Sequence, residues 1–216
     1  MLKLYSYFRS SAAYRVRIAL NLKGLPYQLV PVHLLRGGGE QRSPDYSLIN
    51  PAQLVPSLQD GEFVLTQSLA MLEYLEEAFP STPRLLPADP LSRARVRALA
   101  LTIACEIHPI NNLRVLQYMK STLGVADADR DNWYRHWVIS GLSTLESLLA
   151  QNTTPGDFCH GSSVTIADCC LIPQVFNARR FHIPLDDYPN IVRIDSACMA
   201  LEAFRQAAPG AQPDAE

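Results

Sequence analysis

Residues 2–32 read LKLYSYFRSSAAYRVRIALNLKGLPYQLVPV and carry three structural signals in succession. Residues 2–7 alternate apolar and mixed side chains, which predicts a short strand. The apolar spacing that follows predicts a helix over residues 12–23. The apolar run at residues 27–32 predicts a second strand. The chain therefore opens with the order strand, helix, strand.

Both ends of this helix are marked by residues that favour helix termini. Ser10 and Ser11 stand directly before it, and serine is a preferred N-cap because its oxygen accepts a hydrogen bond from an otherwise unpaired backbone N–H. Gly24 follows the helix, and glycine readily adopts the left-handed conformation that ends many helices. These signals support the predicted boundaries.

The following residues complete a small sheet. Pro56 precedes an apolar strand, a position that suits a residue with no N–H to donate to a sheet. Asp60–Gly61 predicts a tight hairpin between strands at residues 57–59 and 62–65. A second amphipathic helix comes next. We expect a mixed four-stranded sheet with flanking helices, an α/β domain, over residues 1–81.

The remainder of the chain has the pattern of an all-α domain. A proline-rich connector precedes it, and we expect this domain to occupy residues 89–216. Helical patterns cover residues 93–119 with an interruption at Pro109, residues 131–149, residues 165–180 and residues 189–207.

The composition is that of an ordinary globular protein. The chain has 216 residues, of which 48% are hydrophobic and 19% charged, and its formal net charge is −2. This small charge provides no bulk field that would attract nucleic acid or an anionic membrane. The sequence has neither a signal-peptide pattern at its start nor an apolar run of about 18 residues. We expect a cytoplasmic protein with no membrane and no nucleic-acid partner.

The cysteines do not have the spacing of a metal site. The chain contains five of them, and no two have CxxC spacing. An odd number without such spacing predicts reduced, packed thiols rather than a disulfide framework or a zinc site. We therefore expect no bound metal.

A series of motifs along nearly the whole chain resembles the zeta class of the glutathione transferase superfamily. They are YSYFRSS at residues 5–11, YRVRIAL at 14–20, LVP at 54–56, QSLA at 67–70, EYLEE at 73–77, LLP at 85–87, IHPINNLR at 107–114, VTIAD at 164–168 and LIPQV at 171–175. Each motif is weak alone, but their order across both halves is specific. The resemblance implies a thioredoxin-like, glutathione-binding domain over residues 1–81, an all-helical substrate domain over residues 89–216, and a homodimer.

The same resemblance implies an activity. Members of this class include glutathione-dependent cis–trans isomerases of aromatic catabolism, which act on maleylacetoacetate or maleylpyruvate. The implied reaction is a reversible addition of the glutathione thiolate to the cis double bond, which rotates as a single bond before the thiolate leaves. The cofactor is glutathione, and no metal is needed.

Ser10 and Ser11 are the candidate thiol site. A helix start favours an anion, and the thiolate is the reactive form of a thiol. The resemblance implies that Ser10 or Ser11 donates a hydrogen bond to the glutathione sulfur, whereas the alternative is that both serines only cap the helix. Zeta-class proteins usually have cysteine where this chain has Ala12, so the reacting sulfur would come from glutathione.

Further residues match positions that contact the rest of glutathione. The resemblance implies that Gln67 and Ser68, at a predicted helix start, hold the γ-glutamyl end. It implies that the main chain of Val55 pairs with the cysteinyl part and that Gln41 contacts the glycyl end. The cofactor-contacting positions of the helical domain are His108, Asn112 and Arg114. For the histidine, a structural role beside a proline kink is the alternative.

Substrates of this class carry two carboxylates and develop further negative charge, so they need cationic partners. The residues at the matching positions are Arg9, Arg114 and Arg180. With the two serines, these arginines form the candidate catalytic set. The neighbouring Arg15, Arg17 and Arg179 are expected to be surface or structural residues.

Two other functions stay open. The first is a glutathione transferase or dehalogenase that uses the same thiol site on other small electrophiles. The second is a non-catalytic transferase-fold protein that acts by interaction, although the presence of Ser10, Ser11, Gln67 and Ser68 argues against it. Thr165–Asp168 has the form of a capping box, for which we expect a role in folding.

Overall fold

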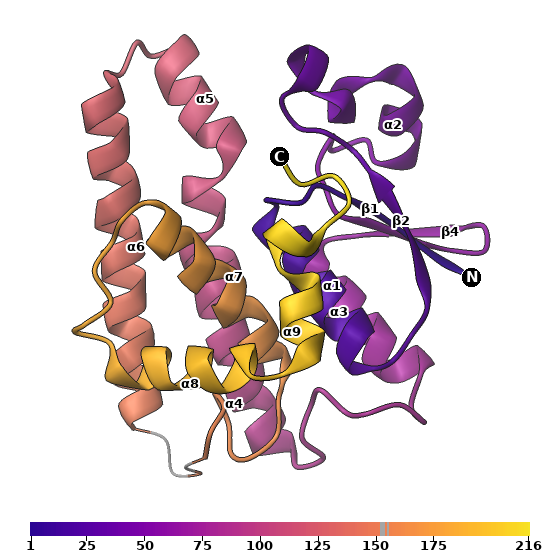
Figure 1. The fold of residues 1–216 in the computed structure, drawn as a ribbon, viewed down its shortest axis with the longest axis vertical. Helices are drawn as coiled ribbons and strands as arrows, with labels where there is room; N and C mark the ends of the chain where they lie inside the picture. Colours follow the sequence, from indigo (N-terminus) through magenta and orange to yellow (C-terminus); the bar gives the residue numbers. More distant parts are fainter. Residues whose placement is uncertain (152–153, 155) are drawn as a thin grey trace. The chain divides into compact units, whose positions relative to one another are not determined.

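The computed structural model describes residues 1–151, 154 and 156–216, which divide into two compact units. Unit 1 comprises Met1–Leu86 together with Met199–Glu216, and unit 2 comprises Pro87–Cys198. Figure 1 traces the chain through both units from indigo to yellow.

Unit 1 is built on the predicted mixed four-stranded sheet, which the structure confirms. Its strands are β1 (Leu2–Ser6), β2 (Tyr27–Pro31), β3 (Ser57–Asp60) and β4 (Phe63–Thr66). They lie in the order β2-β1-β3-β4. β1 runs parallel to β2 and antiparallel to β3, which in turn runs antiparallel to β4. The parallel pair β1–β2 is joined by a helix, as a parallel connection requires.

The first helix of unit 1 starts at the serines that predicted its N-terminus. The helices of this unit are α1 (Ser11–Leu22), α2 (Pro44–Ile49), α3 (Ser68–Ala78) and α9 (Glu202–Ala207). The segment between β2 and α2 contains two 3₁₀ turns. α1 contacts both α3 and α9, and the yellow α9 lies beside the indigo α1 in Figure 1.

The segment Met199–Glu216 groups with unit 1, although the sequence analysis assigned it to the helical domain of residues 89–216. The reason is long-range packing. Phe204 and Ala207 of α9 are fully buried, and the Arg17 Nε group of α1 donates a hydrogen bond of 2.9 Å to the carbonyl of Ala207. A single sequence shows no such contact between residues so far apart.

The helix predicted over residues 189–207 is interrupted. α8 (Pro189–Met199) ends, the chain becomes extended at Leu201, and α9 then begins. Arg205 stabilises this break, because its Nη1 group donates to the carbonyls of Met199, at 3.1 Å, and Ala200, at 2.7 Å. These carbonyls lie at the end of α8, where no intrahelical donors remain.

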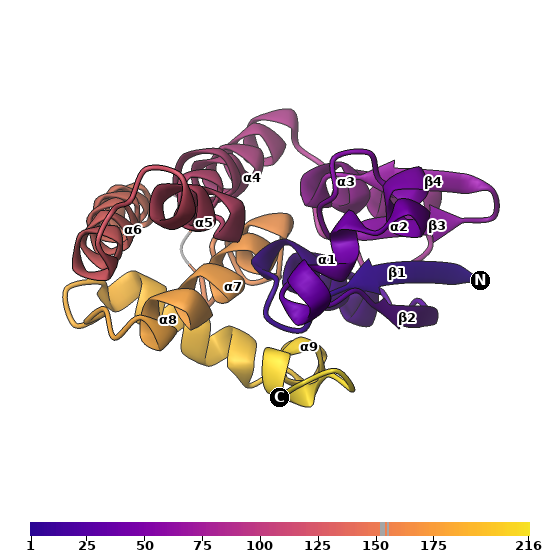
Figure 2. The same cartoon turned by 90° about the horizontal axis from the view of Figure 1, so that it is seen from above.

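Unit 2 is helical in the residues described. Its helices are α4 (Pro90–Leu101), α5 (Leu113–Ser121), α6 (Asp127–Ala150), α7 (Ile166–Arg180) and α8. α4 contacts α7, and α5 contacts α6, as Figures 1 and 2 show. No helix in the described ranges is long and apolar enough to cross a bilayer.

The helical pattern at residues 93–119 breaks earlier than predicted. A π-helical turn, Thr102–Ile107, follows α4 before Pro109 is reached, and the N–H of His108 bonds the carbonyl of Ile103. α6 contacts this turn. Gly141 of α6 lies so close that a Cβ atom there would clash with the side chain of Ile107. The turn therefore depends on a distant glycine as well as on the proline.

Candidate functional site

Ser10 and Ser11 lie at the start of α1, directly after the turn that leaves β1. Ser10 is the N-cap, and its Oγ accepts a hydrogen bond of 3.2 Å from the N–H of Ala13. A hydroxyl has one donor and two acceptor sites, so the cap leaves the Ser10 proton for donation. Ser11 is the first residue of the helix and is buried. The structure therefore gives Ser10 a capping role that is compatible with a second role toward a ligand.

Arg9 stands next to this helix start. Its guanidinium carbon lies 4.7 Å from the centre of the Phe8 ring. The Arg9 Nε atom is buried and has no hydrogen-bond partner within the part of the chain that the structure describes. A buried donor without a partner is costly, which makes Arg9 suited to bind an acceptor from a ligand.

Gln67 and Ser68 lie at the start of α3. Gln67 has φ 68° and ψ 113°, a left-handed conformation that is uncommon for a residue with a side chain. Such strain concentrates at functional positions, where it is offset by the surrounding structure. Ser68 is buried at the first position of the helix. The unpaired N–H groups of this helix start suit a carboxylate.

Arg15 connects the two helix starts, a role that the sequence analysis missed. Its side chain is buried on α1, and its Nη1 group donates a hydrogen bond of 3.2 Å to the Oγ of Ser68. Arg15 follows Ser11 by four residues, so the two lie on one face of α1. That spacing was the available signal, but the position of α3 relative to α1 was not visible in the sequence.

Val55 and Gln41 lie in the connections around the sheet. The peptide bond from Val55 to Pro56 is cis, and the Val55 side chain belongs to a buried cluster with Tyr7, Phe8, Val32 and Tyr46. Gln41 is buried, and its Nε2 lies 3.5 Å from the carbonyl of Leu34. The Gln41 Oε1 atom has no partner among the residues described. Val55 therefore lies beside the turn that carries Arg9, while Gln41 has an unused acceptor.

In unit 2, three predicted residues lie close together along the chain. His108 follows the π-helical turn, and a 3₁₀ turn then leads to Asn112. Asn112 is the N-cap of α5, because its Oδ1 accepts a hydrogen bond of 3.1 Å from the N–H of Arg114. The Arg114 side chain is exposed. This segment therefore presents an imidazole, an amide and a guanidinium within two short turns.

Arg180 is the last residue of α7. Its guanidinium carbon is 4.9 Å from the centre of the Phe181 ring, and Phe181 stacks on Tyr134 with 3.6 Å between ring centres. Burial raises the pKa of Tyr134 to about 12, and the Arg180 charge acts in the opposite direction. The Tyr134 hydroxyl therefore stays neutral near pH 7, as a neighbour rather than an ion-pair partner of Arg180.

Asn111 was not predicted, and its environment is unusual. The side chain is only 8% exposed. Neither its Oδ1 nor its Nδ2 atom has a partner in the described residues. Its position three residues after His108 was the available signal, because residues three apart share a helix face.

Three buried cysteines of unit 2 are poor nucleophiles. Burial raises the pKa of the thiols of Cys159, Cys169 and Cys198, so they stay protonated and unreactive. Among the residues that the structure describes, no group of three or more histidine, cysteine or acidic side chains could hold a metal ion. The arrangement favours binding of an external thiol and of anions.

The family of this chain follows from the comparison with known proteins. Residues 4–83 match the model of the glutathione S-transferase N-terminal domain, and residues 131–194 match that of the C-terminal domain. These two matches define the class as a glutathione transferase. A protein of Vibrio cholerae described as "probable maleylacetoacetate isomerase" is 52% identical, over 98% of this chain and 97% of its own length.

Two solved structures have the same fold over their full length. A holo maleylpyruvate isomerase, described as a bacterial glutathione S-transferase of the zeta class, has a TM-score of 0.95 and 48% identity, covering 99% of this chain and 100% of its own. A maleylacetoacetate isomerase of Methylobacterium extorquens AM1, with bound malonate and glutathione, has a TM-score of 0.94 and 42% identity, covering 99% of both chains. The chain belongs to the zeta class of the glutathione transferase family, so the predicted resemblance is confirmed.

Proposed function

We propose that this chain is a glutathione-dependent cis–trans isomerase that converts maleylacetoacetate or maleylpyruvate to its fumaryl isomer. The observation that carries the proposal is the helix start at Ser10 within a chain that is 52% identical to a full-length relative named for this activity. The protein acts in the cytoplasm and as a homodimer, in keeping with its family and its composition.

The residues of unit 1 fit glutathione. The Ser10 hydroxyl proton and the N–H groups of α1 suit a thiolate, and those of α3 suit the γ-glutamyl carboxylate. Gln67 and Ser68 bind that carboxylate, and Arg15 holds the Ser68 hydroxyl in place. The main chain of Val55 pairs with the peptide of glutathione, while the unmatched oxygen of Gln41 accepts a hydrogen bond from the glycyl N–H.

When bound, glutathione supplies the thiolate that adds to the cis double bond and leaves after rotation. Ser10 lowers the pKa of that thiol by donating a hydrogen bond, and Ser11 is the alternative donor. Arg9, Arg114 and Arg180 bind the substrate carboxylates and stabilise the negative charge that develops on the substrate oxygen. His108, Asn112 and Arg114 provide further polar contacts to the cofactor.

A second function is favoured by one observation. Ala12 stands at the helix start where the zeta class usually has cysteine, so this chain carries no sulfur of its own at the site. Transfer of glutathione to other small electrophiles needs only the cofactor thiolate, and a glutathione transferase or dehalogenase reaction is the alternative.

The proposal is tested by turnover of each cis substrate with purified protein. Appearance of the trans product in the presence of glutathione, with a large loss in the Ser10→Ala variant, is the expected result. Absence of product from both substrates would reject the isomerase assignment. A thermal shift with glutathione, measured in parallel, separates a protein that binds the cofactor from one that acts by interaction alone.

A further inference from the structure

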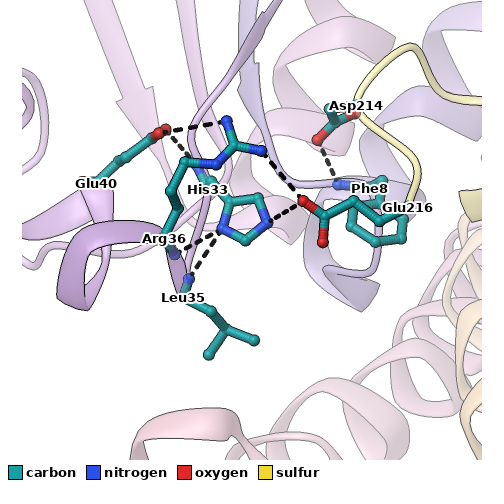
Figure 3. Close-up of polar contacts among 7 residues, drawn as sticks. All are labelled: Phe8, His33, Leu35, Arg36, Glu40, Asp214 and Glu216. Carbon is teal, nitrogen blue, oxygen red and sulfur yellow. Dashed lines mark hydrogen bonds and ion pairs between the residues drawn. The ribbon is translucent and has the colours of Figure 1, made fainter.

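The backbone N–H and C=O groups of Phe8 are held by two residues of opposite charge. Its N–H donates a hydrogen bond of 3.0 Å to Asp214 Oδ2, as Figure 3 shows. Its carbonyl accepts one of 3.0 Å from Arg17 Nη2. Phe8 lies in the turn between β1 and α1, two residues before Ser10. The two contacts hold the two peptide groups on either side of Phe8, the second of which leads to Arg9.

Arg17 donates most of the hydrogen bonds that hold this turn. It is fully buried on α1, and its guanidinium donates to Ser6 Oγ at 2.9 Å, to the Tyr7 carbonyl at 3.4 Å and to the Phe8 carbonyl. The planar guanidinium fork presents its donors in a fixed geometry. Arg17 therefore binds three consecutive residues of the turn, which explains why it is buried although the sequence analysis placed it on the surface or in a structural role.

Asp214 supplies the opposite charge. Burial lowers the pKa of Arg17 to about 10, and the negative charge of Asp214 is among the groups that act in the other direction. The second oxygen of Asp214, Oδ1, is buried without a hydrogen-bond partner among the residues described. The Asp214 side chain as a whole is partly buried, and the nearby positive charge of Arg17 compensates the loss of solvent around its carboxylate.

A second contact anchors the same segment close by. Glu216 Oε1 lies 3.2 Å from His33 Nε2 and 3.1 Å from Arg36 Nη2. The other nitrogen of His33, Nδ1, accepts from the N–H groups of Leu35 and Arg36 at 3.2 and 2.8 Å. In the neutral imidazole the proton is therefore on Nε2, which is the atom that lies beside Glu216 (Figure 3). The segment thus touches both the Phe8 turn and the loop that leads to Gln41.

We propose that Asp214 is a positioning residue of the thiol site. Asp214 accepts a hydrogen bond from the Phe8 N–H while Arg17 donates one to the Phe8 carbonyl, and together these contacts set the position of Arg9 and Ser10. The inference rests on the proposed role of Ser10 toward the glutathione thiol. The C-terminal segment of unit 1 thus takes part in the cofactor site without contacting the cofactor. Loss of the hydrogen bond between the Phe8 N–H and Asp214 lets the turn move, and the Ser10 hydroxyl then forms a weaker hydrogen bond with the glutathione sulfur.

Two variants and two controls test this proposal. Asp214→Ala removes the acceptor, whereas Asp214→Asn keeps one acceptor and loses the charge. Glu202→Gln is the matched control, because this acidic residue lies in the same segment and pairs only locally, with Arg205 at 2.6 Å. Ser10→Ala provides the reference for a disturbed thiol site.

The first measurement is hydrogen exchange at the Phe8 amide. Asp214→Ala should speed exchange by roughly tenfold, as expected when one hydrogen bond to a charged group is lost. Asp214→Asn should have a smaller effect, and Glu202→Gln none. If Asp214→Ala does not fold, Asp214→Asn carries the test, with a measurable increase in exchange as the expected result.

The second measurement is the ionised fraction of bound glutathione, from its thiolate absorbance, together with kcat and KM. Asp214→Ala should lower the thiolate fraction and kcat by roughly threefold to tenfold, while KM for glutathione changes less because the contacts at α3 remain. If Ser10→Ala lowers the thiolate fraction and neither Asp214 variant alters it or the Phe8 exchange rate, the positioning role is wrong. If Ser10→Ala also leaves the thiolate fraction unchanged, the proposed thiol site itself is wrong.

Discussion

Asp168 at the start of α7 gives the sharpest stability prediction. The side chain is fully buried. Its Oδ1 accepts from the N–H of Cys159 at 2.8 Å, and its Oδ2 accepts from the N–H and the hydroxyl of Thr165 at 2.8 and 3.0 Å. Thr165 in turn caps the helix, which completes the capping box that the sequence predicted. One carboxylate thus satisfies two backbone donors that have no access to water.

Replacing Asp168 by alanine leaves both backbone N–H groups buried without a hydrogen-bond acceptor. Each unsatisfied buried donor costs about 1–3 kcal/mol. Removal of the carboxylate recovers part of this cost, because burial raises the pKa of Asp168 and so disfavours its ionised form. We expect a net loss of about 3 kcal/mol, which corresponds to a fall in Tm of roughly 6–12 °C for a chain of this length.

Thermal unfolding followed by circular dichroism measures this effect. Asp131→Ala is the control, since Asp131 lies on α6 with a half-exposed side chain that pairs with Arg130, and such pairs contribute about 0–1 kcal/mol. Equal Tm values for the two variants would refute the role of the capping box in stability.

The raised pKa of Asp168 also predicts a dependence on pH. Its folded-state pKa lies above the ordinary value of 3.8, so its contribution is complete below that value and is lost as the pH rises through the folded-state pKa. Asp168→Asn does not titrate. The stability gap between wild type and Asp168→Asn should therefore be larger near pH 4 than near pH 7, as urea unfolding at both pH values would measure, and a gap that grows with pH would contradict this reasoning.

Three further substitutions have defined outcomes. Ser10→Ala should lower kcat/KM by roughly 10²-fold, because one hydrogen-bond donor to developing charge is removed. Steady-state kinetics measures this effect, and an unchanged kcat/KM would mean that another residue is the donor. Arg15→Lys should weaken glutathione binding by roughly tenfold, because lysine cannot reproduce the guanidinium contact with Ser68. Calorimetry measures the affinity, and a wild-type affinity in this variant would contradict the prediction. Gly141→Ala should cost about 1–3 kcal/mol by overpacking against Ile107, and an unchanged Tm would show that the π-helical turn can yield.

The sequence predicted those parts of the fold that local chemistry determines. The strand–helix–strand opening followed from apolar spacing and from Ser10 as a cap, which α1 confirms. The π-helical turn was not predictable, because it depends on the close approach of Gly141 from another helix. The place of α9 was wrong for a related reason, since it is held by a contact between Arg17 and Ala207, 190 residues apart.

The residues of the candidate site likewise fall into those that local sequence features indicate and those that depend on long-range packing. Ser10, Ser11, Gln67 and Ser68 were found because helix starts and motifs are local features. Arg15 was missed because its burial depends on α3 lying against α1. Asp214 carried no signal in the sequence, where it stands in a short stretch of small and polar residues. Residues that act on a site through the backbone of another segment become visible only when the packing is known.

The most direct measurement of the central claim is the ratio of trans product formed to glutathione consumed. Purified protein is incubated with maleylacetoacetate and, separately, with maleylpyruvate at a glutathione concentration well below that of the substrate. A glutathione-dependent isomerase should give many turnovers of at least one substrate per glutathione, with the glutathione recovered intact and no turnover in its absence. Product that stops at one equivalent per glutathione, or that forms without it, would contradict the assignment as a glutathione-dependent isomerase.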